Sequence, residues 1–191
     1  MQQSIRAELI YNPYAGQGVI KRELEEVIAL LASNGWDVET WWVSRPFEAT
    51  ERARDAASRG VNVVIAAGGD GTIHEIANGL VGTDTALGVI PTGTTNVWAL
   101  QMGIPTLNPM MPGTMAAKFV TNLENRFSQS ISAFHNRFSQ SLSPNYYRKV
   151  LLRAAQVLIE GYTVEVDVGE VDGVVDLRRD DHRRLVRDGN A

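Results

Sequence analysis

The chain has 191 residues, of which 44% are hydrophobic and 21% are charged, and this composition suits one globular domain with a sizeable core. It contains no cysteine, which excludes disulfides, thiolate metal sites and a cysteine nucleophile. The formal charge of −4 argues against a nucleic-acid partner. The first residues form no apolar signal-peptide core, and no apolar run approaches the roughly 20 residues of a membrane span. We therefore expect a soluble, cytoplasmic protein.

Strand and helix patterns alternate from the amino terminus. Residues 5–11 alternate apolar and polar side chains, which predicts a first strand. An apolar stripe from Ile20 to Leu31 predicts a helix that ends near Asn34-Gly35. Residues 36–43 follow as a second predicted strand. Ser44 is then expected to cap a helix that carries an alanine stripe and closes at Gly60.

The stretch from Val61 to Leu80 is the most informative part of the chain. It opens as an apolar run, which is typical of a strand that is covered on both faces. It then breaks into glycines and resumes with apolar residues at helical spacing. Thr72 and Glu75 match a capping box, which places the helix start directly after the glycines. A strand, a glycine turn and a helix N-terminus together predict an anion site, although such turns also use glycine for steric reasons alone.

A second loop of the same kind follows a fourth predicted strand at residues 86–90. This loop, residues 91–96, contains three threonines, a glycine and an asparagine. Strands that alternate with helices predict an α/β fold with a doubly wound, mainly parallel sheet and helices on both faces. In such folds the ligand crevice lies beyond the carboxyl ends of the strands. The loops that begin at Asn12, Ser44, Gly68 and Thr92 all leave such ends.

The second half of the chain carries a repeat. Residues 125–132 return as residues 136–143, and their apolar side chains fall on one face of a helix that ends before Pro144. This helix is expected to pack on its own domain or on a partner copy; a lipid-facing helix and a disordered segment are the alternatives. Residues 146–159 predict a further amphipathic helix. The four tryptophans are expected in the core rather than on a stacking platform.

Three motifs, in order and spacing, resemble the diacylglycerol kinase catalytic domain family, which includes bacterial lipid kinases and sphingosine kinases. They are Asn12-Pro13-Tyr14-Ala15-Gly16, Gly68-Gly69-Asp70-Gly71-Thr72-Ile73-His74-Glu75 and Pro91-Thr92-Gly93-Thr94-Thr95-Asn96. The resemblance resumes between Ala154 and Gly173. It implies ATP-dependent phosphorylation of a lipid hydroxyl, with ATP and Mg²⁺ as the nucleotide and the metal.

The resemblance also implies roles for particular residues. Asp70 would belong to the catalytic centre, either in Mg²⁺–phosphate coordination or near the acceptor hydroxyl. Ser44 stands where the family usually has threonine, and Val97 replaces an aspartate that is common in the family. The implied nucleotide-binding residues are Asn12, Pro13, Tyr14, Ala15, Gly16, Ser44, Gly68, Gly69, Asp70, Gly71, Thr72, Ile73, His74, Glu75 and Thr94.

The resemblance implies a second, mostly β lobe, which this chain is expected to lack. The sequence therefore predicts a nucleotide-binding domain over residues 1–173, with an insertion that contains the repeat at about 106–144. A charged tail at 174–191 follows and is expected to be disordered. The implied acceptor is a lipid alcohol such as diacylglycerol; peripheral membrane contact and a homodimer remain open. A non-catalytic nucleotide-binding or regulatory protein is one alternative. An NAD kinase, which shares the Gly-Gly-Asp-Gly turn, is another.

Overall fold

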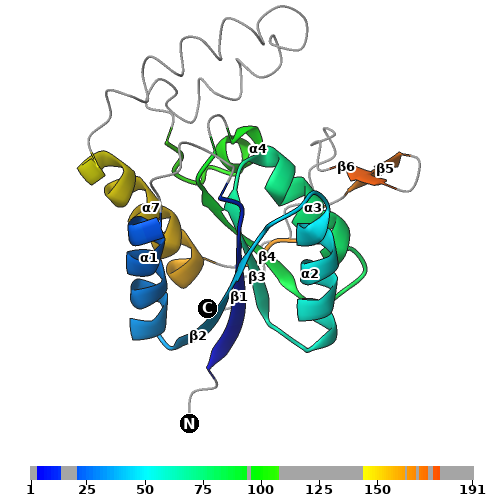
Figure 1. Cartoon of the computed structure of the whole chain (residues 1–191), viewed down its shortest axis with the longest axis horizontal. Helices are drawn as coiled ribbons and strands as arrows, with labels where there is room; N and C mark the ends of the chain where they lie inside the picture. The colour runs from blue at the N-terminus through cyan, green and yellow to red at the C-terminus, as the bar shows by residue number, and fades with distance from the viewer. Residues whose placement is uncertain are drawn as a thin grey trace, which may run out of the picture.

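A computed structural model describes residues 4–13, 21–93, 96–107, 144–161, 163–166, 168–171 and 174–176. Its main sheet is parallel and has the strand order β2-β1-β3-β4 (Figure 1). The strands are β1 (Ile5–Tyr11), β2 (Trp36–Trp42), β3 (Val63–Gly68) and β4 (Ala86–Pro91). The predicted α/β fold with a parallel sheet is confirmed, and each of the four predicted strands is present.

Helices cover both faces of the sheet. α1 (Lys21–Ser33) and α7 (Pro144–Glu160) lie on one face, and α2 (Glu48–Ser58) and α3 (Asp70–Leu80) lie on the other (Figure 1). The short helix α4 (Val97–Gln101) follows β4. Within the described residues, no helix is both long and apolar enough to cross a membrane.

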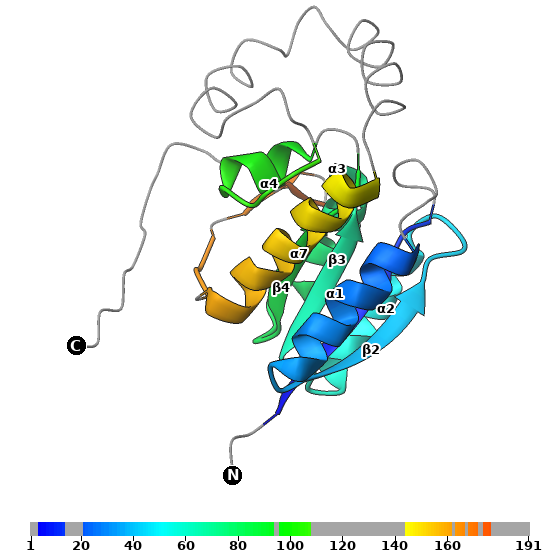
Figure 2. The ribbon, with the colours of Figure 1, turned by 90° about the vertical axis from the view of Figure 1, so that its left-hand side faces the viewer.

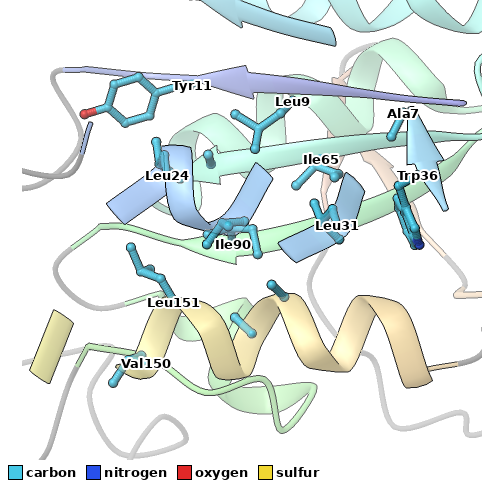
Figure 3. Close-up of a cluster of buried hydrophobic side chains, with 14 of the residues drawn as sticks. Ala7, Leu9, Tyr11, Leu24, Leu31, Trp36, Ile65, Ile90, Val150 and Leu151 are labelled. Atoms are coloured by element: carbon cyan, nitrogen blue, oxygen red, sulfur yellow. The ribbon is translucent and has the colours of Figure 1, made fainter. Parts of the chain in front are cut away.

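Large side chains fill the space between the sheet and the helices α1 and α7. Leu9, Ile65 and Ile90 of the strands pack against Leu31 of α1 and Leu151 of α7, and all five are almost completely buried (Figure 3). Each large aliphatic side chain that leaves water stabilises the fold by about 1.5–3 kcal/mol. This face is therefore the main apolar core of the domain.

The opposite face packs more closely because its side chains are small. Ala49, Ala53 and Ala56 of α2 are buried, as the alanine stripe in the sequence predicts. A Cβ atom at Gly79 of α3 would lie 2.5 Å from the carbonyl oxygen of Thr50, so only glycine allows this approach of the two helices. The hydroxyl of Thr50 donates a hydrogen bond of 2.8 Å to the carbonyl of Glu75. α2 and α3 are thereby fixed to each other.

One charged side chain lies inside the second face. The carboxylate of Glu8, on β1, is completely buried and accepts hydrogen bonds from the guanidinium groups of Arg52 and Arg59. Arg59 also pairs with Asp55 and with Glu39. A buried carboxylate is tolerated only when it is paired and hydrogen-bonded, and this network meets both conditions.

The carboxyl-terminal part differs from the sequence expectation at one boundary. β5 (Gly169–Val171) and β6 (Val174–Asp176) pair as an antiparallel hairpin, so the first three residues of the predicted tail form a strand. The valines of β6 supply the β propensity that the arginine-rich residues after them lack. The repeat at 125–143 and the remainder of the tail lie outside the described residues, as does most of the predicted insertion.

The four tryptophans differ in how deeply they are buried. Trp36 is buried in the core, as expected, and Trp98 is half-buried. The prediction is wrong for Trp41 and Trp42, which are 36% and 44% exposed. Both lie at the carboxyl end of β2, an edge strand of the sheet, where few neighbours are available to cover large rings.

Candidate functional site

The described residues that directly follow β1, β3 and β4 lie together at the carboxyl edge of the sheet (Figure 2). We call this edge the rim. The backbone N–H of Asn12 donates to the carbonyl of Ala67 at 3.1 Å. The N–H groups of Thr92 and Gly93 both donate to the carbonyl of Gly68, at 3.0 and 3.1 Å. Backbone hydrogen bonds therefore join the ends of three strands into one surface.

Two of the rim glycines are required sterically. A Cβ atom at Gly68 would lie 2.4 Å from Cβ of Thr72, and one at Gly93 would lie 2.4 Å from Cα of Gly69. Gly93 thus packs against the backbone of Gly69 and Gly68 packs against the side chain of Thr72, so a larger residue at either position would force its neighbour to move. Gly71 differs, because a Cβ atom there would meet nothing within 4 Å. Packing explains Gly68 and Gly93 but leaves Gly71 unexplained.

The start of α3 corrects the predicted capping box. The helix begins at Asp70, its N-cap is Gly69, and no side chain caps it. Thr72 lies within the first turn, is buried, and accepts a hydrogen bond of 3.1 Å from Nδ2 of Asn12. The helix starts earlier than predicted because the extended backbone of Gly69 enters it directly, and because the carboxylate of Asp70 suits a first turn.

Asp70 links the two glycine-containing loops. Its Oδ2 atom accepts the backbone N–H of Val97 and its Oδ1 atom accepts that of Trp98, both at 3.0 Å. These N–H groups belong to the first turn of α4, where no intrahelical partner exists for them. The carboxylate of Asp70 therefore caps α4 from the first turn of α3. Val97 contributes its backbone N–H to this contact.

The β4–α4 loop contains buried polar atoms that the described residues leave without a hydrogen-bond partner. They are Oγ1 of Thr92 and Oδ1 of Asn96, and each of these residues is 1% exposed. The Nδ2 atom of Asn96 donates to the carbonyl of Gly93 at 2.6 Å, and the backbone of Asn96 is left-handed, with φ 49°. Buried unpaired polar atoms are rare in folded proteins and call for an explanation.

Neither Thr92 nor Asn96 is among the site residues that the sequence singles out. Their position in a polar loop directly after a buried strand is the sequence signal that marks them, whereas the resemblance singles out Thr94. Thr94 lies outside the described residues, as do Tyr14, Ala15 and Gly16. The structure therefore adds two residues to the candidate site from within the same motif.

Ser44 has a local role that the sequence did not reveal. Its hydroxyl donates to Oε2 of Glu48 at 2.9 Å, and the backbone N–H groups of Ser44 and Arg45 donate to the same oxygen at 2.6 and 3.1 Å. These hydrogen bonds, the one from the backbone of Ser44 above all, lower the pKa of the Glu48 carboxyl. The expectation that Ser44 caps α2 is wrong, because the helix begins at Glu48 with Phe47 as its N-cap.

The remaining predicted residues occupy different environments. Ile73 is completely buried in the core, so only its backbone can reach a ligand, whereas His74 and Glu75 are half-buried on α3. Asn12 and Pro13 are half-buried at the rim. No group of three histidine, aspartate or glutamate side chains that could hold a metal ion occurs among the described residues. Among the described residues, Asp70 is the carboxylate that links the two glycine-containing loops.

A parallel sheet whose glycine turns lead into helices at its carboxyl edge defines an α/β ligand-binding domain. The family model of the diacylglycerol kinase catalytic domain matches residues 6–126, which is more than half of the chain. The chain belongs to the diacylglycerol kinase catalytic domain family.

Several known proteins are similar to this chain. The diacylglycerol kinase of Bacillus subtilis (strain 168) is 32% identical over 170 residues, which cover 88% of this chain and 42% of the relative. That of Staphylococcus aureus (strain JH9) is 33% identical over 135 residues, covering 67% and 43%. The crystal structure of a diacylglycerol kinase from Bacillus anthracis str. Sterne shares the fold, with a TM-score of 0.62 and 24% identity over 92% of this chain and 46% of that chain. The chain therefore spans less than half the length of these relatives.

Proposed function

We propose that this chain is the ATP-binding lobe of a lipid kinase that transfers the γ-phosphoryl group of ATP to the hydroxyl of a lipid alcohol such as diacylglycerol. Membership of the family and the names of the relatives support a kinase. The observation that carries the proposal is the rim, where the glycine turn before α3 and the β4–α4 loop share backbone hydrogen bonds. The cytoplasm, where ATP is made, is the proposed location, with peripheral contact to the membrane that holds the acceptor.

The rim residues suit a nucleotide. The first N–H groups of a helix lack intrahelical partners, and the helix dipole makes that end positive, so the start of α3 favours phosphate. The open space at Gly71 lets a phosphate approach the backbone. Thr92 and Asn96 offer polar atoms that a ligand would satisfy. We propose that three parts of the rim hold the nucleotide. They are the loop from Asn12 to Gly16 (Asn12, Pro13, Tyr14, Ala15 and Gly16), the turn from Gly69 to Glu75, and the side chain of Thr94.

Asp70 is the residue proposed to meet Mg²⁺. Each of its oxygens accepts one backbone hydrogen bond, and a carboxylate oxygen has a second acceptor direction that remains available. A lone carboxylate is compatible with Mg²⁺, which commonly takes one or two carboxylates and completes its shell with waters and substrate phosphates. When bound, the ion would neutralise charge on the transferring phosphoryl group.

A second candidate function is nucleotide binding without transfer. It is favoured by the contacts of Asp70, because a carboxylate that caps α4 through both oxygens already has a structural role. In that case Asp70 would hold the loop in place for a bound nucleotide, and the chain would act as a regulatory or binding protein.

The test separates binding from transfer. Transfer of labelled γ-phosphate from ATP·Mg²⁺ to diacylglycerol in mixed micelles is measured for the chain and for Asp70→Ala, and ATP affinity is measured by titration calorimetry. We expect transfer by the chain and its loss in Asp70→Ala. The control is Asp84→Ala, because Asp84 is exposed in the turn between α3 and β4, at the far end of the sheet. ATP binding without a labelled lipid would support the second candidate, and the absence of both would contradict the two proposals.

A further inference from the structure

Asn96 joins the β4–α4 loop to the helix α4 in a rare backbone conformation. Its φ is 49° and its ψ is 56°, and among the described residues Phe47 is the one other non-glycine residue with a positive φ. Glycine and asparagine adopt this left-handed conformation at the lowest cost. Asn96 is also the N-cap of α4, but its side chain does not cap the helix. The presence of asparagine at this position therefore needs a different explanation.

The side chain of Asn96 closes the loop that precedes it. Its Nδ2 atom donates a hydrogen bond of 2.6 Å to the carbonyl of Gly93. Gly93 meets the glycine turn before α3, since a Cβ atom there would lie 2.4 Å from Cα of Gly69 and 3.1 Å from Oδ1 of Asn96. The buried amide of Asn96 thus lies against the contact between the two loops and holds Gly93 in the position that this contact requires.

The backbone that follows Asn96 holds the carboxylate of Asp70. An N-cap side chain ordinarily accepts the N–H of the second or third helical residue. Here Asp70 takes that place, because Oδ2 accepts the N–H of Val97 and Oδ1 accepts that of Trp98, both at 3.0 Å. These are the first two N–H groups of α4, so their direction depends on the conformation of the residue before them, which is the left-handed Asn96. Asn96 therefore orients Asp70 through its backbone.

The amide of Asn96 adds little to the stability of the fold. Its Oδ1 atom is buried and has no hydrogen-bond partner among the described residues. An unpaired buried acceptor typically costs more free energy than one ordinary hydrogen bond contributes, so the unpaired Oδ1 outweighs the bond that Nδ2 makes. Glycine would give the same backbone without an unpaired oxygen. The asparagine side chain thus serves the geometry of the loop rather than stability.

From these contacts we infer that Asn96 is a positioning residue for Asp70. Its left-handed backbone directs the N–H groups of Val97 and Trp98 at the carboxylate, and its amide fixes the β4–α4 loop against the glycine turn. Both oxygens of Asp70 are thereby fixed in orientation. The inference rests on the proposed function, in which Asp70 meets Mg²⁺ beside the phosphates of ATP. Asn96 then determines how strongly the metal supports ATP binding, although it touches neither.

The Mg²⁺ dependence of ATP binding tests this positioning role. ATP affinity is measured by titration calorimetry in Mg²⁺ and in EDTA, and the ratio of the two affinities is the gain due to the metal. We expect a gain in the unchanged chain and its loss in Asp70→Ala. Groups that orient a metal-binding side chain typically contribute about 10- to 100-fold to metal affinity, so Asn96→Ala should reduce the gain by about tenfold or more. Asn96→Gly keeps the left-handed backbone and should retain more of the gain than Asn96→Ala.

A double-mutant cycle shows whether Asn96 acts through Asp70. In the Asp70→Ala background, Asn96→Ala should cause no further loss of the gain, because the carboxylate that Asn96 positions is already gone. The same variants are compared by thermal unfolding without ligand, where the two losses of stability should be less than additive. Asn96→Gly should melt at the same temperature as the unchanged chain or higher, an outcome that a purely stabilising role of the amide would not produce.

Asn62→Ala is the matched control. Oδ1 of this exposed asparagine accepts the backbone N–H of Arg6 at 2.9 Å, near the amino ends of β1 and β3, at the edge of the sheet opposite the rim. This variant should leave the gain due to the metal unchanged.

Two results would overturn the positioning role of Asn96. One is an Asn96→Ala variant with the full gain. The other is an equal effect of Asn96→Ala with and without Asp70, either on the gain or on the melting temperature, since Asn96 would then act independently of the carboxylate. A chain that binds no ATP would instead refute the proposed function, and less than additive losses of stability would still support the positioning of Asp70.

Discussion

The body of the sheet and its rim are built on different principles. In the body, Leu9 and Ile65 are buried against helices, and even the buried carboxylate of Glu8 is fully engaged by two arginines. At the rim, Thr92 and Asn96 carry buried polar atoms that have no partner among the described residues, and Gly71 faces open space. The buried carboxylate of the body is thus paired in favour of stability, whereas the rim keeps polar groups available for a ligand. Substitutions in the body should therefore change stability, and substitutions at the rim should change binding.

The largest effect is expected at Glu8. Glu8→Ala removes the carboxylate that holds Arg52 and Arg59, and breaking such a buried network costs about 3 kcal/mol of unfolding free energy. Urea denaturation followed by circular dichroism measures this loss. Glu39→Ala, which removes an exposed partner of Arg59, should lower stability by only about 0.5 kcal/mol or less. Equal losses of unfolding free energy in the two variants would show that the buried Glu8 network stabilises the fold no more than an exposed ion pair does.

Gly93→Ala should have the next largest effect. The new Cβ atom would lie 2.4 Å from Cα of Gly69, so one of the two loops must move. Overpacking of this kind costs about 1–3 kcal/mol. Because the displaced loops form the rim, ATP affinity should fall as well, which titration calorimetry measures. A variant with the stability and the ATP affinity of the unchanged chain would show that neither property depends on the close approach of the two loops.

Gly71→Ala should separate binding from stability. Alanine is about 0.5–1 kcal/mol more favourable than glycine inside a helix, and the structure leaves room for the methyl group. The variant should therefore be slightly more stable, while the methyl group obstructs a phosphate at the start of α3. We expect weaker ATP binding together with a higher melting temperature. Unchanged ATP affinity would place the phosphates elsewhere.

The smallest effect is a pH dependence at Glu48. Hydrogen bonds from Ser44 and Arg45 lower the pKa of this carboxyl below its ordinary value of 4.5 in the folded chain. Its contribution to stability is therefore present above that value and is lost as the pH falls through the lower, folded pKa. Glu48→Gln should melt slightly below the unchanged chain at neutral pH, and the difference should vanish in acid. A difference that persists in acid would point to packing rather than to charge.

Much of the body could be predicted from the sequence because its signals are local. The apolar run before Gly68 and the alanine stripe of α2 report directly on buried strands and on a closely packed helix, and both are confirmed. Glu8 could not be placed, because the two arginines that stabilise it come from α2 and from its C-cap, more than forty residues away. The exposure of Trp41 and Trp42 depends on β2 being an edge strand, which is a property of the strand order.

The rim could be predicted only in outline. Its position beyond the strand ends follows from the alternation of strands and helices, and the loops after β1, β3 and β4 do meet there. The details depend on contacts between loops. Thr72 matches a capping pattern, but its hydroxyl accepts a hydrogen bond from Asn12, and Asp70 caps a different helix, α4. Ser44 likewise binds Glu48 next to it.

Amide hydrogen exchange with and without ATP·Mg²⁺ tests most directly the claim that the rim is the nucleotide site. We predict protection in the peptides that carry Asn12, the first turn of α3 and the loop from Thr92 to Asn96, with little change in the strands. Gly71→Ala should weaken this protection at the same ATP concentration. Protection that falls elsewhere, or no protection at a saturating ATP concentration, would contradict the account.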